Sequence, residues 1–212
     1  MNKLRTILLA CLLSIATTPL MADFTGPFIG VQINASGAEL DGQHTDEDGA
    51  VTKGQAGQVF RMAGIEAGWT FGLGDSFGLT VGVSNMGGDG TIKADDAADN
   101  ADVDIKIEGP KTVYIAPTVA VSDSSAVYLK IGKTTADVSA SGDVTGTPND
   151  LDGRTIAIGT QSIFASGFFI QTEAGVQTFD EVKITGIGGS STAVLKADPE
   201  IAYGSVTLGV KF

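Results

Sequence analysis

The last seven residues of the chain, Val206 to Phe212, alternate strictly between apolar and polar side chains. Val206, Leu208, Val210 and Phe212 share one side of this alternation, and Lys211 lies on the other. A period of two is typical of a β-strand with one apolar face and one polar face. The last residues of most soluble domains are loosely held, whereas this sequence stops inside a strand pattern on a large aromatic residue.

The first 22 residues have the order of a secretory signal peptide. Lys3 and Arg5 precede an apolar run from Ile7 to Ala16, and the small residue Ala22 follows it. The apolar run is shorter than the ~20 residues that cross a bilayer as a helix. We therefore expect residues 1–22 to be removed during export and residues 23–212 to form a single mature domain.

The composition of residues 23–212 excludes several kinds of protein. The only cysteine, Cys11, lies in the signal segment, so the mature domain has neither a disulfide nor a thiol nucleophile. It keeps 11 of the 13 basic residues and all 25 acidic ones, and the net charge of −14 disfavours nucleic acid as a partner. It contains no apolar stretch near 18 residues, so a mature domain embedded in a membrane must be a closed barrel.

Eight segments of the mature domain have the alternation of strands, with about the ~9–11 residues that a tilted strand needs to cross a membrane. They are residues 28–36, 59–71, 76–86, 112–121, 126–135, 154–164, 168–178 and 201–212. The connections between them are long and short in turn, which is the pattern of an up-and-down barrel with both termini at one end. The sequence therefore predicts an all-β fold, an eight-stranded antiparallel transmembrane barrel with four long extracellular loops and three short periplasmic turns. A soluble lipocalin-type barrel also has eight antiparallel strands, but it does not account for this asymmetry.

We assign one set of residues to the polar face of these strands and another set to the apolar face. The polar face points inward, and an eight-stranded barrel is just wide enough to be filled by side chains. We expect a plugging ion-pair network there, with a narrow polar pore as the alternative; its members are Glu66, Lys130, Glu173 and Lys211. The apolar face points to lipid and ends in an aromatic girdle beside the short turns; its members are Phe28, Trp69, Phe71, Phe77 and Phe168.

The long connections are rich in carboxylates, and Asp95, Asp96, Asp99 and Asp102 are weak candidates for a divalent-cation site. Their spacing does not match an EF-hand loop, so we expect a solvated anionic face with neither a metal nor a cofactor. The only histidine, His44, lies within the first long connection and is expected to be exposed to solvent.

The alternating end, Gly204-x-Val206-x-Leu208-x-Val210-x-Phe212, and the order of strands resemble the small eight-stranded outer-membrane barrels. This group includes the transmembrane domain of OmpA, the OmpX-like proteins and the opacity-type surface antigens. The resemblance implies the outer membrane of a Gram-negative-type bacterium, with its lipid and lipopolysaccharide as partners. It also implies that the barrel-assembly machinery recognises the terminal strand that ends at Phe212.

Three functions are compatible with the sequence. The first, which we favour, is a non-enzymatic surface scaffold whose acidic extracellular loops contact partners outside the cell. The second is a small porin-like channel or carrier for solutes. The third is an outer-membrane lipid-modifying enzyme using His44, although nothing in the sequence places this histidine beside a nucleophile.

Overall fold

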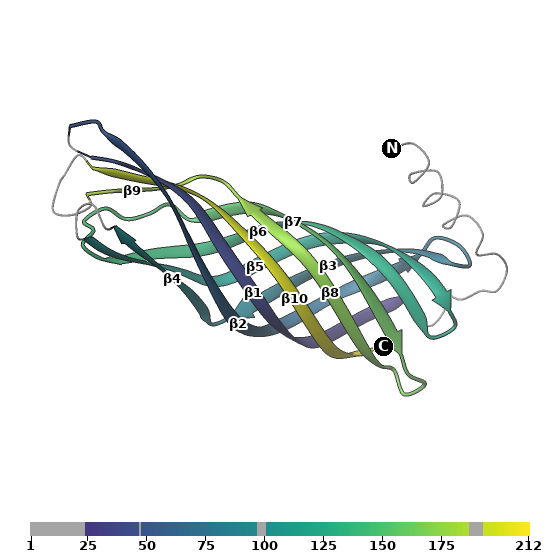
Figure 1. The fold of residues 1–212 in the computed structure, drawn as a ribbon. Helices are drawn as coiled ribbons and strands as arrows, with labels where there is room; N and C mark the ends of the chain where they lie inside the picture. Colours follow the sequence, from purple (N-terminus) through teal and green to yellow (C-terminus); the bar gives the residue numbers. More distant parts are fainter. Residues whose placement is uncertain (1–23, 47, 97–100, 187–192) are drawn as a thin grey trace, which may run out of the picture.

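A computed structural model describes residues 24–46, 48–96, 101–186 and 193–212, and it is an elongated β-barrel (Figure 1). The expected signal peptide lies outside the described residues. The strands are β1 (Gly26–Thr45), β2 (Val51–Gly72), β3 (Phe77–Gly87), β4 (Asp89–Asp96), β5 (Ala101–Ser122), β6 (Ser125–Gly142), β7 (Leu151–Ile163), β8 (Phe168–Phe179), β9 (Val182–Thr185) and β10 (Val194–Lys211). In this part of the chain no helix is long and apolar enough to cross a bilayer.

Eight of these strands form a closed antiparallel ring, which confirms the predicted fold class. The order around the ring is β1-β2-β3-β5-β6-β7-β8-β10, and β10 pairs back onto β1. The closing ladder runs from Phe28 opposite Lys211 to Thr45 opposite Val194. The short strands β4 and β9 pair with β5 and β10 respectively.

The two ends of the barrel differ. The end that holds Gly26 and Lys211 also holds the short turns at residues 73–76, 123–124 and 164–167 (Figure 1). At the opposite end the strands continue through most of the segments expected to be long loops. The hairpin of β1 and β2, for example, turns at residues 46–50, where the Asp46 carboxylate accepts hydrogen bonds from the backbone N–H of Asp48 (3.0 Å) and Ala50 (2.7 Å). We call the half with the termini the terminal section and the other half the distal section.

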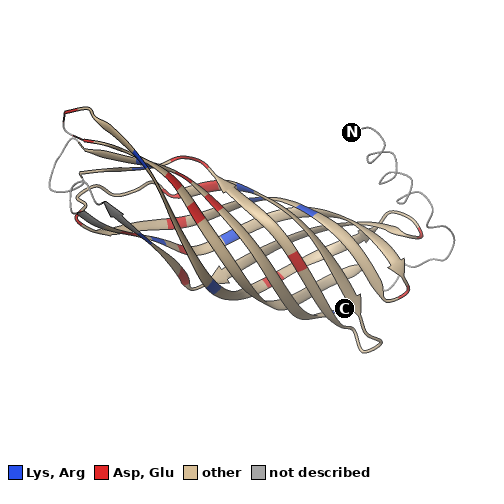
Figure 2. Ribbon diagram, viewed as in Figure 1, with Lys and Arg blue, Asp and Glu red and all other residues tan. Residues whose placement is uncertain are grey.

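The two faces of the wall exchange their polarity between these sections. In the terminal part of β1, Ile33 is exposed on the outer face and Gln32 is buried inside. Further along the same strand, Leu40 is buried inside and Glu39 is exposed. The terminal section is therefore apolar outside and polar inside, and the distal section is the reverse. Figure 2 shows the charged residues gathered mainly over the distal section.

The distal section has an apolar core of its own. The buried residues of this core come from eight strands and from Ala193, which precedes β10; the strand residues are Ala38, Leu40, Ile92, Val103, Ile105, Ile107, Ala136, Val138, Leu151, Phe179, Val182, Ile184, Ala197 and Ile201. Each Val, Leu, Ile or Phe side chain that leaves water stabilises the fold by about 1.5–3 kcal/mol. The distal strands are therefore held by packing as well as by their ladders, and they continue the barrel.

Contacts outside the ring hold the distal strands together. Lys106 on β5 pairs with Glu108 (Nζ to Oε1, 2.7 Å) and with Asp89 on β4 (Nζ to Oδ2, 3.2 Å). Both hydrogen bonds raise the pKa of the Lys106 ammonium, and the one to Glu108 has the larger effect. The connection between β6 and β7 donates backbone hydrogen bonds from Thr145 and Gly146 to the end of β9, both at 2.9 Å.

Candidate functional site: the lumen of the terminal section

Three charged side chains meet inside the barrel, and small inward residues around Glu66 leave room for them. Glu66 on β2 lies between the inward positions Gly64 and Gly68, and it is opposite Gly30 on β1 and Ser84 on β3. These neighbours leave space in the lumen, so that a long side chain can cross it. Lys130 on β6 and Glu173 on β8 reach the same level from the other side of the ring.

The three side chains form a buried ion-pair cluster. The ammonium nitrogen of Lys130 lies 2.9 Å from Glu66 Oε1 and 2.6 Å from Glu173 Oε2. The side chains of Lys130 and Glu66 are 3% and 0% exposed, and that of Glu173 is 1% exposed. Lys130 also lies over the ring of Tyr114, 4.3 Å from its centroid. A buried charge this well partnered is costly to unpair, because removing one member leaves the others in a low dielectric.

All three tyrosines of the chain donate to the two carboxylates. The Tyr114 hydroxyl donates to Glu66 Oε1 (2.7 Å), Tyr128 to Glu173 Oε2 (2.8 Å) and Tyr203 to Glu173 Oε1 (2.7 Å). The second oxygen of Glu66 accepts from Gln171 Nε2 (3.1 Å) and Thr207 Oγ1 (3.2 Å). These donors stabilise the negative charge that one lysine does not balance.

Glycine makes room for two of these tyrosines. A Cβ atom on Gly159 of β7 would collide with the phenol of Tyr128, and one on Gly82 of β3 would collide with that of Tyr114. Only glycine lets the rings lie flat against the wall and reach the carboxylates. Any larger residue at these positions would force the rings out of the cluster.

The lumen is filled above and below this charged layer. Towards the distal section, hydroxyl contacts join Thr112 to Thr134 (2.7 Å) and Thr134 to Thr155. Towards the termini, a group of buried apolar residues closes the barrel: Phe24, Phe28, Ala120, Ala126, Ile163 and Phe169. Beside the cluster there is a cavity of about 20 Å³, which has room for about one water molecule. Side chains therefore occupy most of the space beside the charged cluster.

Of the four residues expected to form the network, Lys211 lies apart from the other three. Its ammonium donates to Thr70 Oγ1 (3.2 Å) and lies 5.3 Å from the centroid of the Phe28 ring. Lys211 is near the end of β10, whereas the residues of β10 that contact the carboxylates, Thr207 and Tyr203, lie four and eight positions earlier. Lys211 thus faces the lumen, but in the part of the chain that the structure describes no ion pair joins it to Glu66 or Glu173.

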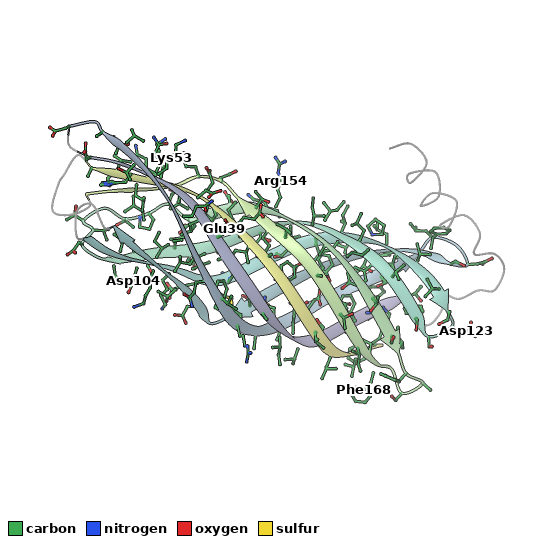
Figure 3. All side chains as sticks on the ribbon, in the orientation of Figure 1. Glu39, Lys53, Asp104, Asp123, Arg154 and Phe168 are labelled. Carbon is green, nitrogen blue, oxygen red and sulfur yellow. The ribbon has the colours of Figure 1, made fainter. Side chains whose placement is uncertain are left out.

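Phe28 was expected in the lipid-facing aromatic girdle, and this prediction was wrong because its side chain lies in the lumen. Its side chain is 4% exposed and packs edge-on against Phe169, with ring centroids 5.8 Å apart. The alternation of β1 puts Ile29 and Val31 on the outer face, so that Phe28 points inward. The other four expected girdle residues are exposed on the outer face near the terminal end: Trp69, Phe71, Phe77 and Phe168. Figure 3 shows Phe168 at that end of the barrel, far from Lys53 and Glu39.

The terminal strand has the two faces that its alternation predicts. Val206 and Leu208 are exposed on the outer face, Val210 is half-buried, and the Phe212 ring is 77% exposed. The backbone N–H of Phe212 donates to Pro27 O (3.0 Å) at the end of the closing ladder. Whether this strand is an assembly signal stays a prediction.

The remaining candidates are the acidic residues of the second long connection and His44. Asp99 and the side chains of Asp95, Asp96 and Asp102 lie outside the described residues, and among the described ones no group of three or more His, Cys, Asp or Glu could hold a metal ion. His44 is not an exposed loop residue as expected. It lies on β1 opposite Thr52 and Leu195 and is 7% exposed, because the strands of the first hairpin extend past it.

Comparison with known families identifies this architecture. The family model described as outer membrane protein beta-barrel domain matches residues 7–211. The chain belongs to this family. It is thus an integral outer-membrane β-barrel. None of the curated proteins compared with it matches the chain.

Solved outer-membrane proteins have a similar fold. OprG from Pseudomonas aeruginosa is 17% identical with a TM-score of 0.55, covering 89% of this chain and 96% of that one. AlkL, solved in DMPC bilayers, is 13% identical with a TM-score of 0.53, covering 89% and 92%. Ail from Yersinia pestis, solved in complex with the heparin analogue sucrose octasulfate, is 13% identical with a TM-score of 0.48, covering 88% and 99%. These likenesses concern the fold alone.

Proposed function

We propose that this family member is a non-conducting, non-enzymatic scaffold that holds a rigid acidic β extension outside the cell for surface interactions. The observation that carries this proposal is the closed lumen. The charged cluster of Glu66, Lys130 and Glu173 crosses it, and the apolar residues around Phe28 and Phe169 close it below. Partners of such a barrel bind its outer surface, and most of the charge on that surface lies on the distal section.

Single-channel recording in planar bilayers tests the closed lumen. The wild-type barrel is expected to give no stable conductance steps. The variant Lys130→Ala/Phe28→Ala/Phe169→Ala, which removes side chains from both layers that close the lumen, serves as the comparison. Stable steps from the wild type, equal to those from the variant, would refute the non-conducting scaffold.

The acidic exterior indicates the chemistry of the extracellular partner. Exposed carboxylates on the first hairpin and the neighbouring strand β10 include Glu39, Asp41, Asp198 and Glu200. We propose that a partner with basic groups binds there. Cells that display the wild type should adhere to a polycationic surface more than cells that display a variant with all four residues changed to Asn or Gln, and salt should reduce the difference. Equal adhesion of the two kinds of cells would show that these four carboxylates do not bind the partner.

A second candidate, a carrier for small apolar molecules, rests on a seam in the distal wall. Within the described residues, β4 pairs with β5 alone, and β2 beyond Ala63 towards the first hairpin pairs with β1 alone. No ladder therefore joins β2 to β4, and the gap is covered by the ring of Phe60 lying against Gly90. An open cleft of about 570 Å³ lies beside it, lined by Gly37, Ala38, Glu39, Ala56, Gly57, Gln58 and Val59.

Replacing Phe60 distinguishes this candidate from the scaffold. If the seam passes apolar molecules between the distal core and the lipid, Phe60→Ala should change the rate at which an apolar fluorescent dye enters cells. Phe77→Ala, which removes an exposed ring at the far end of the barrel, is the matched control. Dye entry that is unchanged by Phe60→Ala would exclude the seam as a route.

The absence of catalysis is also part of the proposal. His44→Ala should leave lipid A modification in the membrane unchanged when it is compared with the wild type. A modification that the wild type produces and the variant loses would favour the enzyme instead.

A further inference from the structure

Three cations lie side by side on the outer wall of the barrel. Lys111 on β5, Lys133 on β6 and Arg154 on β7 are exposed and point outward, and Figure 3 shows Arg154 projecting away from the ribbon part-way along the barrel. Lys133 is directly opposite Arg154 in the β6–β7 ladder. Lys133 is also opposite Val113, two residues from Lys111, in the β5–β6 ladder. Three adjacent strands thus present one positive patch in a chain whose net charge is −12.

The patch lies at the extracellular edge of the lipid-facing surface. The next outward residues towards the termini are apolar and exposed: Val113, Ile131 and Ile156. Lys111 and Arg154 each precede an outward residue at the terminal end of the wall, Val121 and Phe164, by ten positions. Ten residues of strand rise about 33 Å, or about 25 Å along the axis at the usual tilt, which is the height of the apolar band of such barrels.

The local charges are not balanced within the protein. Like charges directly opposite each other in a ladder destabilise it, and Lys133 and Arg154 are such a pair. Lys133 has one acidic partner, Asp152, at 2.9 Å (Nζ to Oδ1), and this pair is 66% and 57% exposed. Among the described residues no ion pair joins Lys111 or Arg154 to a carboxylate. An external anion between these strands would relieve the repulsion.

We propose that Lys111, Lys133 and Arg154 bind the phosphate groups of the outer-leaflet glycolipid, with its acyl chains on the apolar surface below. The depth of the patch argues for this partner, since phosphates of the lipid headgroup lie where the apolar band ends. Arginine binds a phosphate with two parallel N–H donors, and lysine adds a compact point charge. The continuity of the patch with the lipid-covered wall separates a lipid from a free phosphate ion as the occupant.

Binding of lipid A to the full mature barrel tests the proposal. The protein is placed in phosphatidylcholine nanodiscs with a chelator to remove divalent ions, and bound bisphosphorylated lipid A is counted by native mass spectrometry. The variant Lys111→Gln/Lys133→Gln/Arg154→Gln should bind roughly a hundredfold more weakly, the summed effect expected of three basic residues at a membrane surface. The control Lys53→Gln/Lys93→Gln/Lys183→Gln removes the same charge from exposed positions of the distal section and should bind like the wild type.

Three further measurements separate the contributions of the lipid phosphates, of free phosphate and of Asp152. Lipid A without phosphates should bind the wild type as weakly as it binds the triple variant, and inorganic phosphate at millimolar concentration should not displace bisphosphorylated lipid A. Asp152→Asn frees Lys133 from its one carboxylate and should tighten lipid A binding.

The outcomes that overturn the proposal are distinct. If the wild type and the triple variant bind lipid A equally, these three residues do not form a lipid A site. If the control variant loses as much binding as the triple variant, net charge alone attracts the lipid. Equal binding of dephosphorylated lipid A assigns the affinity to the apolar wall. Should the triple variant fail to fold, as judged by an unchanged gel mobility on boiling, the single variants Lys111→Gln and Arg154→Gln carry the same test.

Discussion

Lys130 Nζ lies 2.9 Å from Glu66 Oε1, although 64 positions separate the two residues in the sequence. The same nitrogen reaches Glu173 at 2.6 Å, so one lysine ties β6 to β2 and to β8 across the lumen. The ladders join neighbouring strands only, whereas this cluster joins strands on opposite sides of the ring. It therefore braces the barrel and blocks it at the same level.

Replacing this lysine should destabilise the barrel. Lys130→Met keeps most of the side-chain volume but leaves two buried carboxylates without their cation. We expect the free energy of unfolding to fall by about 3–5 kcal/mol, the usual cost of breaking a buried pair. Urea-induced unfolding in lipid vesicles, followed by the fluorescence of Trp69, measures the change.

A charge-free version of the cluster provides the control. Glu66→Gln/Lys130→Met/Glu173→Gln removes all three charges and should recover most of the lost stability, because no buried charge is then left unpaired. If Lys130→Met unfolds at the urea concentration of the wild type, the cluster does not brace the barrel.

Part of this structure could be read from the sequence. Strict alternation in residues such as Val206 and Leu208 predicted the strands of the terminal section, and the order of long and short connections predicted the closed ring. Glu66, Lys130 and Glu173 were predicted to share the lumen, and they meet there. Which charges touch depends on the stagger around the ring, so the sequence could not show that Lys211 contacts Thr70 and not a carboxylate.

The distal section could not be read in the same way, because the meaning of the alternation reverses along a single strand. Residues such as Glu39 and Asp41 were read as loop because they are polar, yet they are the outer face of a strand whose inner face is Ala38 and Leu40. The role of the tyrosines was also missed. Tyr128 shares the inward alternation with Lys130, two residues away, and this signal was available in the sequence.

The burial of Phe28 gives a second prediction. Phe28→Ala removes a ring that packs against Phe169 inside the barrel, and it should lower the free energy of unfolding by about 3–5 kcal/mol. Phe77→Ala removes an exposed ring on the outer wall and should have a much smaller effect. Unfolding in vesicles measures both variants side by side. Equal losses would mean that Phe28 contacts lipid, as the sequence first indicated.

The apolar core of the distal section gives a third prediction. Ile107→Asp buries an unpaired carboxylate among Leu151, Ile184 and their neighbours, and such a charge cannot be accommodated in a packed core. The distal strands should become sensitive to added protease while the terminal section keeps its heat-modifiable gel mobility. Thr135→Asp places the same side chain on the exposed outer face and should leave protease resistance unchanged. Resistance in Ile107→Asp would show that the extension does not depend on this core.

Phe212 gives the last prediction, which separates assembly from stability. The ring is 77% exposed, and the attachment of the residue to β1 is a backbone hydrogen bond to Pro27 O. Phe212→Ser keeps that bond, so the variant should refold in detergent and resist urea like the wild type. If the assembly machinery recognises the ring, the amount of variant in the outer membrane should fall severalfold while export to the periplasm continues. Phe164→Ser, which removes another exposed ring at the same end, should leave the amount unchanged. Membrane fractionation with quantitative blotting compares the three proteins, and equal levels of Phe212→Ser and wild type would exclude Phe212 as the signal.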